Sequence, residues 1–240
     1  MLKPAPFSTR PLYLQVRDLL VGRIAAGEWK PGSALPNEVD LSRDLNVSPG
    51  TVRRALEQME NDHIIYRRQG RGTFVADQTS EELAIRYTNI RTSTGVRISG
   101  HVSGTSVLRA QANELEQRRL RLRPQTFIYR IHRVRYHDKQ PFMVEDVSLP
   151  ETLFPGLAEQ ADVRHRITLL AQQFGLLLGR GEEQVKIGSA DAGTAKELRV
   201  VEKTPILELD RVVYTLDGKP AEWRLAKCHF TEQVYWTEMN

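Results

Sequence analysis

The chain has 240 residues, of which 40% are hydrophobic and 27% are charged, and its formal net charge of +4 corresponds to an isoelectric point near 9.3. This balance is typical of a globular protein with one large or two small domains, and the mild basicity is compatible with a nucleic-acid partner. The single cysteine, Cys228, excludes an intrachain disulfide and indicates a reducing compartment. No apolar run has the length of a membrane helix and no signal-peptide core is present, so we expect a cytoplasmic protein.

The N-terminal third predicts three helices followed by a β-hairpin. Apolar residues at helical spacing predict a first helix between residues 11 and 27. A short second helix is expected after the N-cap Asn37, and a third over residues 49–61 after the N-cap Ser48. The apolar face of the third helix consists of Val52, Ala55, Leu56 and Met59.

Two helices joined by so short a turn predict a helix-turn-helix, in which the first turn of the second helix enters the major groove of DNA. The free N–H groups at the start of that helix suit a phosphate, and Arg53 and Arg54 add cationic donors. The hairpin that follows predicts a wing with Arg71 at its tip, able to contact a groove or a phosphate. For Arg67 and Arg68 a solvated charged face is an equally good interpretation.

Residues 11–76 resemble the winged helix-turn-helix of the GntR family of bacterial transcription regulators. The marks of the resemblance are Pro31-Gly32, Leu35-Pro36-x-Glu38, Val47-Ser48, Thr51-Val52-Arg53 and Gly70-x-Gly72-Thr73. The resemblance implies that the start of the third helix, Glu38 and the wing tip contact DNA. Together with Arg54, the predicted DNA-binding residues are Glu38, Ser48, Thr51, Arg53, Arg54, Gly70, Arg71, Gly72 and Thr73.

Two positions depart from the family pattern. Many members carry a basic residue after Glu38 and another after Ser48, whereas this chain has Val39 and Pro49. The resemblance therefore does not extend to base contacts from these two positions, and we expect an altered operator sequence.

A polar stretch, DQTSEE, follows the wing at residues 77–82 and marks a domain boundary. We expect a winged helix-turn-helix DNA-binding domain over residues 1–76, a linker over 77–91 that couples the domains, and an effector-binding and dimerisation domain over 92–240. From residue 92 on, the pattern favours strands. Strands are expected at 102–110, 126–137, 141–149, 181–190, 205–215 and 220–229, and helices at 112–119, 164–174 and 192–200.

The second domain contains an internal echo. The motif Arg133-Val134-x-Tyr136 recurs as Arg211-Val212-x-Tyr214, and each copy is followed by an aspartate and a proline. We interpret the echo as a duplication, although similar hairpins alone would also give it. Two such hairpins with helices predict an α+β domain with a curved antiparallel sheet and a pocket.

Charged residues on apolar strand faces predict the site. Arg133 and Arg135 share the strand face that begins with aromatic and aliphatic residues, which indicates a partly buried anion site. Glu145 is a carboxylate on an apolar face and needs a partner, and Glu222 with Arg224 forms a similar pair. The alternative is an internal salt-bridge network that holds no ligand.

The second half resembles UTRA, the ligand-sensing domain of the HutC branch of the same family, which has a chorismate-lyase-like fold. The resemblance runs from about residue 92 to 235, with RVRYHDKQPFMVED, Leu149-Pro150 and RVVYTLDGKPAEWR as its marks. It implies that Arg133, Arg135, Glu145 and Glu222 line the effector pocket, and that His165 and Thr168 contact an acidic or phosphate group. With Arg224, these are the predicted effector-binding residues.

These patterns predict a homodimeric transcription regulator, a repressor, that binds palindromic operator DNA under the control of a small anionic metabolite such as a sugar phosphate or a carboxylate. We expect no catalytic residue, metal or cofactor, because no histidine has metal-ligand spacing and no acid/base pair or nucleophile motif is present. The alternatives are a lyase-type enzyme, since the fold type also occurs as a lyase, and a ligand-independent DNA-binding protein.

Overall fold

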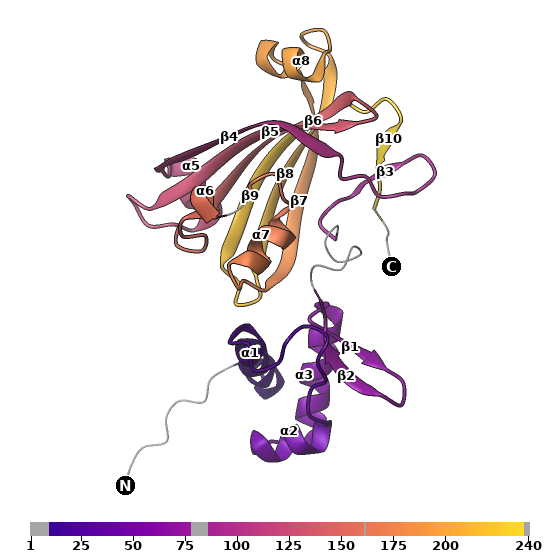
Figure 1. Ribbon diagram of the computed structural model, residues 1–240, viewed down its shortest axis with the longest axis vertical. Coiled ribbons are helices and arrows are strands. Elements are labelled where there is room, and N and C mark those ends of the chain that lie inside the picture. Colours follow the sequence, from indigo (N-terminus) through magenta and orange to yellow (C-terminus); the bar gives the residue numbers. More distant parts are fainter. Residues whose placement is uncertain (1–9, 78–85, 161, 238–240) are drawn as a thin grey trace. The chain divides into compact units, whose positions relative to one another are not determined.

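The computed structural model describes residues 10–77, 86–160 and 162–237, which belong to two compact units, one up to residue 78 and one from residue 79 (Figure 1). Each unit has buried apolar residues of its own and is described separately. Within the described ranges, no helix combines the length and the apolar character that a membrane crossing requires.

The first unit contains three helices and a two-stranded hairpin, as predicted. Its elements are α1 (Leu12–Ala25), α2 (Glu38–Asp44), α3 (Pro49–Asn61), β1 (Ile65–Arg68) and β2 (Gly72–Val75). Asn37 caps α2 by accepting the backbone N–H groups of Val39 and Asp40, and Ser48 caps α3 by accepting the N–H of Thr51. Both predicted N-caps are therefore confirmed.

The core of the first unit is built on α3. The predicted apolar face of this helix is at most 1% exposed throughout its four residues. Leu20 and Ile24 of α1 are buried as well, and α1 packs on α3. Arg17 of α1 donates from Nη2 to Oδ2 of Asp62 at 2.6 Å, so an ion pair fixes α1 to the end of α3. Burying one side of α3 leaves the other side accessible.

The second unit is organised around a six-stranded antiparallel sheet with the order β4-β5-β6-β9-β8-β7. The strands are β4 (His101–Gln111), β5 (Phe127–His137), β6 (Gln140–Pro150), β7 (Leu178–Ser189), β8 (Pro205–Thr215) and β9 (Pro220–Cys228). All six were predicted, and the fold class is confirmed as α+β. The largest difference is the start of β7, where a register shift between Leu178 and Gly181 interrupts the alternation that the prediction used.

The order of elements in this unit repeats. The sequence β4, α5 (Glu114–Leu120), β5, β6 is followed by β7, α8 (Ala192–Leu198), β8, β9. The N-caps of the two helices are Asn113 and Asp191, and both helices end at a left-handed arginine, Arg121 with φ 53° and Arg199 with φ 57°. Each cap of α8 lies 78 positions after its counterpart. The echo in the sequence therefore extends to a whole β–α–β–β unit, and the two copies meet at the pair β6–β9.

Helices cover both faces of the sheet. The front face carries Tyr129 and Ile131, which pack against α6 (Leu157–Gln160) and α7 (Ile167–Gln173). The back face carries Ile128, which packs with the end of α5, and Val134, which packs against α8. Because successive residues of a strand point to opposite sides, Arg133 and Arg135 lie on the front face.

A small second sheet was not predicted. It pairs β3 (Ile90–Thr92) with β10 (Gln233–Tyr235), and strands of three residues are too short to show a periodic pattern. The pairing joins a segment near the start of the described part of this unit to one near its end (Figure 1). The predicted linker over residues 77–91 lies in part outside the described residues, and its residues from Arg86 on belong to the second unit.

Candidate nucleic-acid interface and arginine pocket

The first turn of α3 is accessible and carries hydrogen-bonding side chains. Ser48 Oγ lies 2.9 Å from Thr51 Oγ1 and accepts the backbone N–H of Thr51 at 3.2 Å. Arg53 and Arg54 are exposed, because the apolar face of α3 is turned into the core. The structure thus brings four of the predicted DNA-binding residues together at one helix start, where free N–H groups favour a phosphate.

The wing presents Arg71 at its tip. β1 and β2 pair antiparallel with Arg68 opposite Gly72. Gly70 has φ 69° and Gly72 has φ 107°, conformations that glycine adopts at little cost. Arg71 is exposed, and its backbone N–H closes the turn by donating to the carbonyl oxygen of Arg68 at 2.9 Å. The predicted tip is therefore a tight turn that holds one cationic side chain in solvent.

Arg67 and Arg68 both have partners within the unit. Arg67 lies 3.7 Å from a carboxylate oxygen of Glu38 and 3.4 Å from one of Glu60. The guanidinium of Arg68 lies over the ring of Tyr66, 5.3 Å from its centroid. Neither arginine is a simple solvated charge. Glu38, predicted at the DNA interface, is thereby brought next to the wing.

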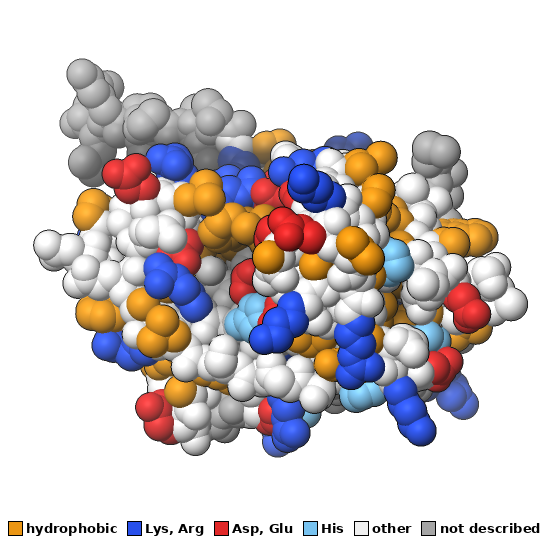
Figure 2. All heavy atoms as spheres, turned by 90° about the horizontal axis from the view of Figure 1, so that it is seen from above, with side chains coloured by type: hydrophobic (Ala, Val, Ile, Leu, Met, Phe, Trp, Pro, Cys, Tyr) orange, Lys and Arg blue, Asp and Glu red, His pale blue; other side chains and the backbone are white. Residues whose placement is uncertain are grey.

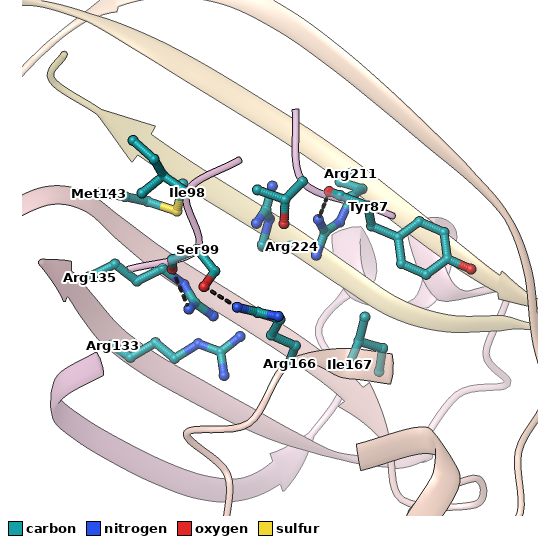
Figure 3. A pocket seen from close by; sticks show the side chains of 11 residues that line it. Tyr87, Ile98, Ser99, Arg133, Arg135, Met143, Arg166, Ile167, Arg211 and Arg224 are labelled. Atoms are coloured by element: carbon teal, nitrogen blue, oxygen red, sulfur yellow. Dashed lines mark hydrogen bonds between the residues drawn. The ribbon is translucent and has the colours of Figure 1, made fainter. Parts of the chain in front are cut away.

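A pocket opens on the front face of the sheet, beneath residues 87–99 and the start of α7 (Figure 3). Its lining residues are Tyr87, Thr88, Ile98, Ser99, Arg133, Arg135, Met143, Arg166, Ile167, Arg211 and Arg224. Of these eleven described residues, five are arginines and none is acidic. In Figure 3 the guanidinium groups of Arg133, Arg135 and Arg166 are directed toward one another, and Arg211 and Arg224 lie on the far side of the pocket.

Glu145 lies behind the pocket lining and forms ion pairs with three of these arginines. Its side chain is fully buried, and its Oε1 accepts from the Nε atoms of both Arg133 and Arg135, while its Oε2 accepts from Arg224 at 3.3 Å. Burial alone would raise the pKa of Glu145, but the three guanidinium charges outweigh it and hold this pKa far below its usual range. Burial lowers the pKa of Arg135 to about 10, which leaves it charged at neutral pH.

A second carboxylate holds the other side of the pocket. Glu222, 1% exposed, accepts from Nη2 of Arg211 at 2.6 Å and from its Nε at 3.2 Å. Nη1 of Arg211 donates to the backbone carbonyl of Tyr87 at 2.5 Å. Arg224 donates from Nη2 to Glu183 at 2.9 Å. Four of the five arginines thus share three carboxylates, all of which lie behind the lining.

The predicted effector-binding residues take different places around the pocket. Arg133, Arg135 and Arg224 line it. Glu145 and Glu222 were expected to line the pocket, but they are not among its lining residues. Their carboxylates lie behind the lining and form ion pairs with arginines. His165 and Thr168 are also outside the lining: the backbone carbonyl of His165 accepts from Nη1 of Arg133 at 2.9 Å, and Thr168 is buried in α7. These residues support the lining.

Several lining residues were missed. Arg211 could have been found, because the echo makes it the counterpart of Arg133. Arg166, whose Nη2 donates to Ser99 Oγ, precedes α7 and carries no periodic signal. Tyr87 comes from the predicted linker, and its hydroxyl donates to the carbonyl of Gly179 at 2.5 Å.

The outer surface has no comparable concentration of one charge on the face that Figure 2 displays. Basic, acidic and apolar side chains are interspersed there. The arginines of the pocket are instead gathered around one interior site, where low dielectric strengthens their field. Such an arrangement favours a small anion over an extended acidic surface.

Two family models match the sequence. Residues 12–75 match the bacterial regulatory proteins of the gntR family, and residues 99–232 match the UTRA domain. The chain belongs to the GntR family. It is a transcription regulator of this family, with a GntR helix-turn-helix domain followed by a UTRA domain, which is a ligand-binding domain.

Other GntR-type regulators are similar over most of their length. The mannosyl-D-glycerate transport/metabolism system repressor MngR of Escherichia coli K12 is 29% identical over 215 residues, which are 89% of this chain and 90% of that protein. The histidine utilization repressor of Pseudomonas aeruginosa is 27% identical over 202 residues, 84% and 80% of the two chains. The crystal structure of PhnF from Mycobacterium smegmatis has the same fold, with a TM-score of 0.55 at 24% identity over 94% of this chain and 99% of that one.

Proposed function

We propose that this GntR-family regulator is a homodimeric repressor whose affinity for a palindromic operator is modulated by a small anionic metabolite bound in the arginine pocket. The observation that carries the proposal is the composition of the lining, which among the described residues has five arginines and no acidic residue. A protein that binds operator DNA acts where that DNA lies, so the proposed location is the bacterial cytoplasm.

The chemistry of the pocket supports an anionic ligand. Burying several guanidinium groups around one site is costly unless negative charge compensates them, and a single carboxylate, Glu145, is shared by three of these arginines, Arg133, Arg135 and Arg224. Nε of Arg224 is buried and has no hydrogen-bond partner among the described residues. A phosphate or carboxylate group offers several acceptor oxygens to such donors. A sugar phosphate or a carboxylate is therefore the proposed class of effector.

The first unit supports DNA binding through two separate sets of contacts. The start of α3, with Ser48, Thr51 and Arg53, is the proposed major-groove element, and Arg71 is the proposed contact of the wing. In a symmetric dimer the two copies would contact half-sites about one helical turn apart.

Coupling between the pocket and DNA binding has a candidate route through Tyr87. This residue lines the pocket and belongs to the predicted linker, and its carbonyl accepts from Arg211. An anion that binds Arg211 would compete with that carbonyl. A ligand changes DNA binding only if its affinity differs between the DNA-binding state and the non-binding state of the protein. Competition between the anion and the Tyr87 carbonyl for Arg211 would provide such a difference in affinity.

The pocket is tested by ligand-dependent thermal stabilisation. Inorganic phosphate and a panel of sugar phosphates and carboxylates are titrated into wild type and Arg135→Gln, with Arg118→Gln, an exposed arginine outside the pocket, as the control. Wild type and the control should be stabilised by the same ligand, and the pocket variant much less. Turnover of the ligand would favour the enzyme alternative, and equal stabilisation of all three proteins would reject the pocket.

DNA contacts are tested by salt-dependent gel shifts on duplex DNA. Arg53→Ala and Arg71→Ala should each weaken binding, and each lost phosphate contact should reduce the slope of log K against log salt by about 1. Arg118→Ala serves as the matched control, because it removes the same charge at a position outside the first unit. Unchanged affinity in both test variants would contradict the assignment of these residues.

A further inference from the structure

The five arginines of the pocket fall into two groups according to what else they bind. Oxygen atoms of residues 99, 163 and 165 accept from one group, which consists of Arg133, Arg135 and Arg166. The other group lies on the far side of the pocket (Figure 3). Of this group, Arg211 donates to the carbonyl of Tyr87, and Arg224 begins a chain of side-chain hydrogen bonds that ends two residues further on, at Asn89.

This chain consists of four side chains from separate elements. Nη2 of Arg224 in β9 donates to Oε1 of Glu183 in β7 at 2.9 Å. The other carboxylate oxygen of Glu183 accepts from the hydroxyl of Tyr235 in β10 at 2.7 Å, and that hydroxyl accepts from Nδ2 of Asn89 at 3.0 Å. An unbroken series of hydrogen bonds therefore runs from the lining of the pocket to the residue that precedes β3.

The backbone places these four residues. The registers of β9, β8 and β7 set Arg224 opposite Arg211, and Arg211 opposite Glu183, so all three lie in one row across the sheet. At the other end, β10 pairs with β3, and the backbone N–H of Trp236 donates to the carbonyl of Asn89 at 2.7 Å. Asn89 is thus bonded to β10 through both its side chain and its backbone.

The chain is sensitive to the contact between Arg224 and Glu183. The two side chains are only 7% and 9% exposed, and a buried carboxylate that loses its cationic partner is strongly destabilised. A carboxylate only accepts, so the hydroxyl of Tyr235 donates to Glu183 and is left to accept from Asn89. Burial raises the pKa of Tyr235 to about 12, so the hydroxyl keeps the proton that it donates. A change at Arg224 therefore reaches each following bond.

We propose that Arg224, Glu183, Tyr235 and Asn89 form a relay that transmits the binding of an anion in the pocket to residues 86–92. The proposal rests on the anion site of the proposed function and assigns the positioning residues that respond to its occupation. It adds a second route to the direct contact between Arg211 and Tyr87.

An anion acts on the relay by competing for Arg224. This arginine lines the pocket, and its buried Nε has no hydrogen-bond partner among the described residues. An anion that binds the guanidinium competes with Glu183 for it. Once Glu183 is released, the hydroxyl of Tyr235 loses its fixed acceptor and Asn89 loses its side-chain partner. Occupation of the pocket thus loosens the contact between β10 and the segment at Asn89.

Tyr235 is the member of the relay that a single substitution removes without touching the pocket lining. Tyr235→Phe keeps the ring and deletes the hydroxyl that joins Glu183 to Asn89. The matched control is Tyr214→Phe. It deletes a hydroxyl that donates to the neighbouring carboxylate, Glu182, at 3.0 Å and that lies on the back face, away from the lining.

Amide hydrogen exchange of the full-length chain, with and without inorganic phosphate, tests the relay. Phosphate should speed exchange in the peptides that cover residues 86–92 and 233–237 of wild type and of Tyr214→Phe. In Tyr235→Phe these peptides should exchange rapidly with or without phosphate. Thermal stabilisation by phosphate, measured on the same samples, reports occupation of the pocket and should be similar in all three proteins.

The outcomes separate the relay from the pocket. Stabilisation of wild type by phosphate with unchanged exchange at residues 86–92 would overturn the relay and leave the anion site standing. The same phosphate-dependent change in Tyr235→Phe as in wild type would also overturn the relay. Absence of any stabilisation would remove the anion site, and the relay with it. If Tyr235→Phe does not fold, Glu183→Gln, which deletes the carboxylate charge that pairs with Arg224, is measured in its place and should give the same result.

DNA binding at constant ionic strength tests whether the relay regulates. Phosphate should change the affinity of wild type and of Tyr214→Phe for duplex DNA by about fivefold or more, the range expected for coupled sites. The change should be less than about twofold in Tyr235→Phe. Equal changes in all three proteins, or no change in wild type, would contradict a regulatory role of the relay.

Discussion

Replacing Glu145 by glutamine removes the negative charge that holds three arginines while preserving the shape of the side chain. Glu145 is fully buried and bonds to Arg133, Arg135 and Arg224. Removing one partner of a buried ion pair costs about 3–5 kcal/mol, because the remaining charge is left uncompensated. For a unit of this size about 1 kcal/mol corresponds to 2–4 °C, so we expect the melting temperature of the second unit to fall by about 6–20 °C.

The pH dependence of this loss has a definite sign. The pKa of Glu145 is depressed in the folded protein, so its stabilising contribution is complete above the ordinary glutamate pKa of about 4.3 and disappears as the pH falls toward the folded pKa. The difference in stability between wild type and Glu145→Gln should therefore be constant from about pH 5 to 8 and shrink below about pH 4.

Calorimetry of both proteins with and without phosphate measures these effects. An anion in the pocket would replace part of the missing charge, so phosphate should stabilise the variant more than wild type. Glu114→Gln, whose side chain is 90% exposed, is the control and should melt like wild type. A variant that is as stable as wild type and insensitive to phosphate would refute the view that Glu145 balances the charge of the pocket.

Two further outcomes follow from local geometry. Gly100 has φ 63°, and an added Cβ would lie 2.6 Å from an aromatic side chain. We therefore expect Gly100→Ala to destabilise the second unit by more than about 1 kcal/mol, measured by denaturant titration. Gly104→Ala is the control, because Gly104 has open space around it, and its effect should be clearly smaller. Burial opposes the charged form of His132, but its hydrogen bonds to Asp146 and Glu197 outweigh burial and raise its pKa. Its contribution to stability is full below about pH 6.5 and lost as the pH rises through the raised pKa, so melting curves of wild type and His132→Gln should converge at high pH.

Most elements of the fold follow from local signals in the sequence. The cap Ser48 with Pro49 fixes the start of α3, and the alternation along residues 127–137 separates the two faces of β5. The turn at Gly218, with φ 84°, marks the hairpin β8–β9. These signals act over a few residues, and the structure adopts the conformation that each of them favours.

The site was predictable only in part, because it depends on pairings between distant residues. Alternation places Arg133 and Arg135 on one face of β5. Glu145 is a carboxylate on an apolar strand face, so the sequence predicts that it pairs with a cationic group or a ligand. The contact between Glu145 and Arg224, 79 residues apart, depends on the register of β6 with β9, which no local pattern specifies. Arg166 precedes a helix start without a motif and could not be assigned from sequence.

The duplicated architecture also makes the two sides of the pocket unequal. The first copy of the echo has arginine at position 135, while the corresponding position of the second copy is Val213, which is buried in the apolar cluster beneath the front face. One side of the pocket therefore carries Arg133, Arg135 and Arg166, and the other carries Arg211 and Arg224. A ligand with a charged head and a neutral tail gains most when its head lies against the first copy. The two repeated units therefore contribute unequally to the charge of the pocket, so its two ends are chemically distinct.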